Sequence, residues 1–146
     1  MTTYINKTLF TGAVAVLIVA IVHFYLTIAG GDLYVFFGAG EEFAALDKAG
    51  SLKPMITTFI IAIVFTILAL FGFSGAGLIG KMPLLKWGLY TIAIIFIARG
   101  LLFFYEVYVL SFLFSEYPVR FVLFSLYSLI TGTLYLFGTI KYYKNQ

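Results

Sequence analysis

Residues 54–73 read PMITTFIIAIVFTILALFGF, a run without any charged side chain. About 20 apolar residues are enough to cross the hydrocarbon core of a bilayer as a single helix. Lipid offers backbone groups no hydrogen-bond partners, so such a segment crosses either as a helix or as part of a closed barrel. Barrel strands alternate apolar and polar residues, whereas residues 60–65 (IIAIVF) do not alternate. The run therefore predicts a transmembrane helix.

Three further stretches of the chain have the same apolar character: 8–29, 83–108 and 118–140. All three prolines of the chain, Pro54, Pro83 and Pro118, fall where one of these helices is expected to begin. The first turn of a helix tolerates proline because its N–H would have no partner there. We therefore expect an all-α fold, with residues 1–146 forming one integral membrane bundle of four transmembrane helices.

Composition supports this assignment and excludes several kinds of chemistry. The chain has 146 residues, of which 63% are hydrophobic and only 10% are charged, whereas soluble domains carry roughly 25% charged residues. The absence of cysteine excludes disulfides, thiol catalysis, iron–sulfur clusters and cysteine zinc sites. His23 is the one histidine, so haem cannot be held between two histidines of one chain. We expect no cofactor and no metal, and the scattered basic residues form no nucleic-acid footprint.

The basic residues predict the orientation of the chain in the membrane. Five of them lie at the two termini and in the second loop: Lys7, Lys81, Lys86, Lys141 and Lys144. Three lie in the first and third loops: Lys48, Lys53 and Arg120. An excess of lysine and arginine marks the cytoplasmic side. We expect both termini in the cytoplasm and, from the small size and the lack of a targeting sequence, a bacterial inner membrane.

The first outer loop, residues 30–53, is the longest connection, and we expect it to cap the bundle. Residues 36–46 read FFGAGEEFAAL and predict a short interfacial helix with Glu41 and Glu42 in its first turn. Acidic side chains at that position complement the positive end of the helix dipole.

A stripe of small and hydroxyl residues recurs at three- and four-residue spacing on the fourth stretch: Ser125, Ser128, Gly132, Tyr135 and Thr139. Such stripes allow membrane helices to approach closely. We interpret this one as a helix-packing face.

The ionisable residues of the third stretch, Arg99 and Glu106, are the most informative for function. They are seven residues apart and so share one helix face. At about 1.5 Å of rise per residue, Arg99, Glu106 and His23 all fall in the outer half of the membrane. Glu41 and Glu42 could close over them from the loop. These five residues are the predicted ligand-binding set, with no catalytic residue among them.

Three interpretations of Arg99 stay open. In the first, Arg99 pairs with Glu106, a loop carboxylate or backbone carbonyls and only fixes the positions of the helices. In the second, it recognises an anionic ligand or lipid. In the third, it meets an acidic residue of a partner subunit. Arginine suits the second role because it is always charged and offers a planar fork of donors. For His23 the alternatives are a local hydrogen bond, a proton relay or a ligand contact.

The functional hypothesis is a non-enzymatic inner-membrane protein that binds or passes a small amphipathic or anionic, lipid-like ligand through a polar pocket. The alternative is an accessory, regulatory or immunity subunit acting through helix–helix contacts, either with membrane partners or as a homo-oligomer. An intramembrane transferase or hydrolase is the least favoured interpretation, because no nucleophile is placed beside a base.

Overall fold

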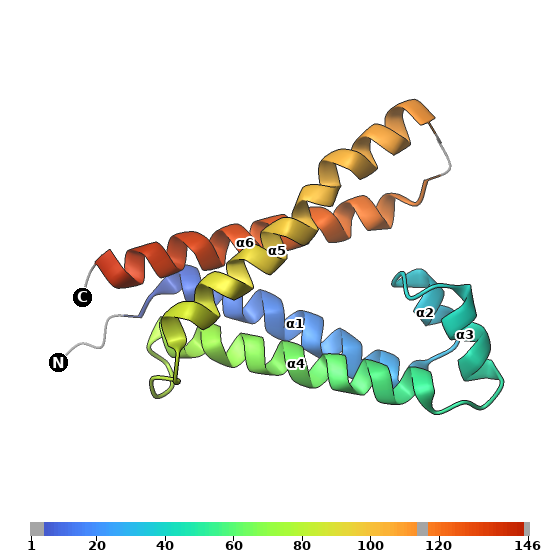
Figure 1. The fold of residues 1–146 in the computed structure, drawn as a ribbon, viewed down its shortest axis with the longest axis horizontal. Helices are drawn as coiled ribbons and strands as arrows, with labels where there is room; N and C mark the ends of the chain where they lie inside the picture. The colour runs from blue at the N-terminus through green and yellow to red at the C-terminus, as the bar shows by residue number, and fades with distance from the viewer. Residues whose placement is uncertain (1–4, 114–116, 145–146) are drawn as a thin grey trace. The chain divides into compact units, whose positions relative to one another are not determined.

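The computed structural model describes residues 5–113 and 117–144. Its elements are α1 (Lys7–Ala29), α2 (Asp32–Phe36), α3 (Glu41–Lys48), α4 (Lys53–Ala76), α5 (Leu85–Tyr108), the π-helical turn η1 (Val109–Leu113) and α6 (Val119–Lys144) (Figure 1). The described residues contain no strand. Four helices are long and apolar enough to cross a membrane: α1, α4, α5 continued by η1, and α6. The predicted all-α fold is confirmed, and the chain is a multi-pass membrane protein.

The observed ends of the helices differ from the predicted ones for local reasons. Helix α5 begins at Leu85 rather than at Pro83, because Leu84 adopts a left-handed conformation with φ of 54°. Beyond Tyr108 the chain continues as a π-helical turn instead of stopping. The loop helix α3 lies where the acidic first turn predicted it, whereas the five-residue helix α2 was not predicted.

The chain divides into two compact units, and each is described by itself. The terminal unit consists of residues 1–15 and 68–146, and the loop unit consists of residues 16–67. Helices α1 and α4 contribute residues to both units, while α5 and α6 lie entirely in the terminal unit.

In the terminal unit, Tyr135 of α6 is the side chain against which α1 and α4 pack. It is fully buried, and its hydroxyl donates a hydrogen bond of 3.0 Å to the carbonyl of Leu68 in α4. Gly12 of α1 and Gly72 of α4 both face this tyrosine: a Cβ on Gly72 would collide with its hydroxyl, and one on Gly12 would lie only 3.0 Å from its ring. The absence of side chains at these two positions makes room for the ring.

Asn6 joins the start of α1 to two other helices of the terminal unit. Its side-chain oxygen accepts a hydrogen bond from the Leu9 N–H, as expected of a residue that caps a helix N-terminus. Its side-chain nitrogen donates to the carbonyl of Gly138 at 2.8 Å, and its backbone N–H donates to the carbonyl of Ala76 at 3.1 Å. Asn6 is buried, so these bonds satisfy a polar group that water does not reach.

Helices α5 and α6 cross near their middle (Figure 1). At the crossing, a Cβ on Gly100 would lie 2.5 Å from the backbone nitrogen of Leu129, and one on Gly132 would lie 2.6 Å from the backbone nitrogen of Ile97. The two backbones meet here without an intervening side chain. This crossing fixes which residues of α5 face α6 on either side of it, Arg99 among them.

In the loop unit, α2 and α3 pack on the end of α1 around the buried residues Leu26, Tyr34 and Ala44. The Tyr34 and Phe43 rings meet edge to face, with their centroids 5.1 Å apart. Burial of this small cluster is what stabilises helices as short as α2, which would not form alone.

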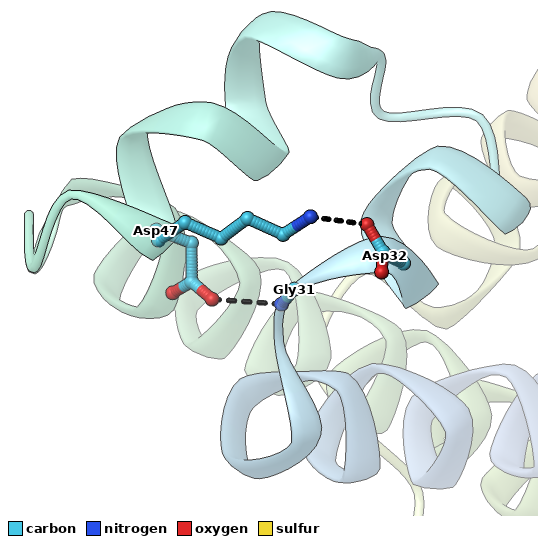
Figure 2. A network of polar contacts seen from close by, with 4 residues as sticks. Gly31, Asp32 and Asp47 are labelled. Carbon is cyan, nitrogen blue, oxygen red and sulfur yellow. Dashed lines mark hydrogen bonds and ion pairs between the residues drawn. The ribbon is translucent and has the colours of Figure 1, made fainter.

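Polar contacts close the base of the loop. The Asp47 carboxylate accepts a hydrogen bond of 2.7 Å from the Gly31 N–H, and Lys48 forms an exposed ion pair with Asp32 (Figure 2). Gly30 and Gly31 have φ of 51° and 58°, values that favour glycine and that turn the chain sharply after α1. The loop is therefore an ordered cap on the end of α1.

Candidate functional site

Arg99 occupies the second half of α5, directly before Gly100 at the helix crossing. Its Nη1 donates a hydrogen bond of 2.5 Å to the Oγ of Ser125 on α6, and the same nitrogen lies 3.8 Å from Oε1 of Glu106. The predicted pairing of Arg99 with Glu106 on one helix face is present, two turns apart. The hydroxyl of Ser125 adds an anchor on the facing helix.

The two charged groups of this pair differ sharply in exposure. The Arg99 side chain is 43% exposed, whereas that of Glu106 is 7% exposed. A separation of 3.8 Å permits an ion pair but exceeds the 2.7–3.2 Å range typical of hydrogen bonds to nitrogen. The guanidinium therefore attracts Glu106 without donating a hydrogen bond to it.

Glu106 itself has an incomplete set of partners. Its Oε2 atom is buried and has no hydrogen-bond partner within the described part of the chain. Buried polar atoms of native proteins are nearly always hydrogen-bonded, so an unsatisfied carboxylate oxygen requires an explanation. The π-helical turn η1 starts three residues later, and such turns occur frequently at functional sites.

Tyr117, in the short segment before α6, also belongs to this cluster. Its burial and, second, the negative charge of Glu106 raise the pKa of its hydroxyl above the usual value. The positive charge of Arg99 lowers the same pKa, a smaller effect. The cluster thus contains a cation (Arg99), an acid (Glu106) and two hydroxyls (Ser125, Tyr117), all in the terminal unit.

The other predicted residues, His23, Glu41 and Glu42, belong to the loop unit. His23 is half-buried; its Nδ1 donates a hydrogen bond of 2.8 Å to the Val19 carbonyl, and its ring lies 5.0 Å from that of Phe65. A local hydrogen bond of this kind was one of the three alternatives for His23. Glu41 and Glu42 are exposed in the first turn of α3.

Two members of the cluster, Ser125 and Tyr117, were not among the predicted site residues. Ser125 was visible in the sequence only as part of the small-residue stripe of the fourth helix, where it indicated packing. Tyr117 has no sequence signal beyond its position before Pro118. Within the part of the chain that the structure describes, no three residues of the metal-ligating types lie close enough together to hold a metal ion.

Comparisons with protein-family models, with curated proteins and with solved structures found no match.

Proposed function

We propose that this protein is a non-enzymatic inner-membrane protein, with both termini in the cytoplasm, that binds a small anionic amphiphile through Arg99. The observation that carries the proposal is a half-exposed guanidinium in a membrane-spanning helix, held in place by Ser125. The ligand class is a lipid-like molecule with an anionic head and an apolar tail.

The N–H donors of Arg99 support this proposal. A guanidinium has five N–H donors and no acceptor. Among the described residues, one donor is taken by the neutral hydroxyl of Ser125, and Glu106 lies beyond hydrogen-bond distance. A carboxylate, sulfate or phosphate group accepts two parallel hydrogen bonds from such a fork. The donors that remain are therefore suited to an anion supplied from outside this cluster.

The position of Arg99 in a membrane-spanning helix is energetically costly. A charged side chain in the hydrocarbon costs about 2.5–3.5 kcal/mol on insertion scales, and such residues are usually paired. Glu106 offsets part of this cost through the charge attraction, but its carboxylate makes no hydrogen bond with the guanidinium. Binding of an anion at the exposed side of Arg99 would provide the missing pairing. An amphiphile would place its tail among the apolar side chains that dominate the helices.

The test is native mass spectrometry of the protein extracted mildly from its own membranes, as wild type and as Arg99→Ala. We expect a bound amphiphile on the wild type and its loss from the variant. Arg120→Ala, at the start of α6, is the matched control and should retain the amphiphile, because it removes a positive charge elsewhere. Arg99→Lys should bind weakly, since an ammonium lacks the planar fork.

Two results would overturn the proposal. If a second protein accompanies the wild type in fixed stoichiometry and no small molecule is bound, Arg99 meets a partner's acid and the protein is an accessory subunit. If Arg99→Ala retains the amphiphile and is merely less stable, Arg99 only fixes the helices.

A further inference from the structure

The carboxylate of Glu106 is the feature of this cluster that anion binding alone does not explain. Glu106 is nine-tenths buried, and its Oε2 has no donor among the described residues. Its charge is compensated by Arg99 at 3.8 Å. In a helix that spans a membrane, an uncompensated buried charge is costly, so the carboxylate depends on this guanidinium.

An anion that binds Arg99 changes this balance. It brings a second negative charge to a guanidinium that already faces Glu106. Coulomb interactions over about 4 Å are several times stronger in a protein site than in water. One guanidinium cannot fully compensate two anions, and neutralising one of them removes the excess negative charge. The unsatisfied Oε2 is the atom with an open position for a proton.

We infer that anion binding at Arg99 is coupled to the uptake of one proton by Glu106, an inference that rests on the proposed function. In the free state Arg99 and the Glu106 carboxylate have a net charge of zero. In the bound state Arg99 and the ligand anion together have a net charge of zero, and Glu106 is a neutral acid. The only bond formed is O–H on the carboxyl group, and the proton comes from the aqueous phase. The site remains neutral in both states.

The groups around Glu106 are compatible with this exchange. Arg99, on the same helix, is the cation that faces it. From the segment before α6, Tyr117 contributes a hydroxyl that stays protonated at neutral pH, because its pKa is raised. From α6, Ser125 contributes a neutral hydroxyl to Arg99. Tyr105 and Arg99 also act electrostatically on Tyr117.

The experiment uses probes whose own charge does not depend on pH. The full-length protein in nanodiscs of zwitterionic lipid is titrated with 1-decanesulfonate from pH 5 to pH 8 by isothermal titration calorimetry, with empty nanodiscs subtracted. Methanesulfonate, which has the same head without the tail, is titrated in parallel. Each titration is repeated in two buffers of different ionisation enthalpy, which gives the number of protons taken up without any variant.

We expect the affinity of the wild type for decanesulfonate to fall by up to about tenfold per pH unit as pH rises, the slope for one proton bound per ligand. Glu106→Gln, a neutral isostere of the protonated acid, should bind with an affinity that does not change with pH and is at least that of the wild type at pH 5. Arg99→Ala should not bind at any pH.

The outcomes separate the two proposals. Binding that depends on Arg99 but shows no pH slope and no proton uptake overturns the coupling and leaves the anion site standing. A pH slope that persists in Glu106→Gln assigns the proton to another group. Failure of the wild type to bind decanesulfonate at any pH overturns the proposed function itself. Methanesulfonate binding as tight as that of decanesulfonate overturns the amphiphile as ligand in favour of a free anion. If Glu106→Gln does not fold, the two-buffer measurement on the wild type decides the coupling.

Discussion

Gly100 of α5 lies against the backbone of Leu129 in α6, with room for a hydrogen atom but not for a methyl group. This contact is adjacent in sequence to Arg99, so the crossing of the two helices and the position of the guanidinium are set at the same point. Any change that separates the helices here also moves Arg99 away from Ser125.

Gly100→Ala should therefore destabilise the protein and weaken anion binding together. The new Cβ would lie 2.5 Å from the Leu129 nitrogen, which belongs to the backbone and cannot turn aside. Overpacking of this kind costs about 1–3 kcal/mol. Unfolding in mixed micelles measures the stability. Gly80→Ala is the control, because nothing lies within 4 Å of its Cβ position. Equal stability of the two variants would show that α5 and α6 do not meet as closely as described.

Ser125→Ala should weaken anion binding by about tenfold while the fold persists, since a hydrogen bond to a charged group contributes about 1.5–3 kcal/mol. The hydroxyl of Ser125 orients Arg99 from the opposite helix. Ser128→Ala is the matched control, because the Ser128 hydroxyl donates to a carbonyl of its own helix, that of Phe124. Calorimetric titration with decanesulfonate measures both. Loss of affinity in the control but not in Ser125→Ala would contradict this role.

The two aspartates of the connection between α1 and α4 should differ in importance. Asp47→Ala removes the acceptor of the Gly31 N–H, and the lost bond should cost about 1–3 kcal/mol of local stability. Asp32→Ala removes an exposed ion pair with Lys48 and should cost no more than about 1 kcal/mol. Hydrogen exchange of the α2 and α3 amides checks both: faster exchange is expected in Asp47→Ala alone. Equal protection in the two variants would refute the assignment.

Tyr117 should make the stability depend on alkaline pH. Because its pKa is raised in the folded protein, the unfolded chain loses the phenol proton first as pH increases. The stabilisation is complete below a pH of about 10, the ordinary tyrosine pKa, and is lost as pH rises through the folded value. The difference between ultraviolet titrations of wild type and Tyr117→Phe isolates this hydroxyl.

Glu106→Gln should lower the Tyr117 pKa only in part, since burial is the larger cause of the raised value. An unchanged Tyr117 pKa in this variant would place Glu106 away from Tyr117.

Hydropathy and proline positions predicted the four long helices because the length of an apolar run and the cost of burying charge are local properties of the sequence. Hydropathy and proline positions do not predict α2. Its five residues have no helical signal of their own and depend on tertiary burial of Tyr34 against Leu26 and Ala44.

The part of the candidate site that lies on α5 alone was predictable from the sequence, whereas its contact with α6 was not. Arg99 and Glu106 were placed together because seven residues make two helical turns. Ser125 was not recognised as a partner, because its approach depends on where α5 and α6 cross, and that depends on the contact between Gly100 and Leu129. The π-helical turn after Glu106 has no sequence signal that hydropathy detects.

One hydrogen bond of Asn6 joins segments that leave the ribosome at very different times. Asn6 and Gly138 are 132 residues apart, and the Gly138 carbonyl belongs to α6. At roughly 5–20 residues per second, the ribosome needs on the order of ten seconds to reach it. Until then the side-chain nitrogen of Asn6 lacks the acceptor that it has in the folded protein. A nascent chain that stalls before α6 therefore leaves the start of α1 without this partner.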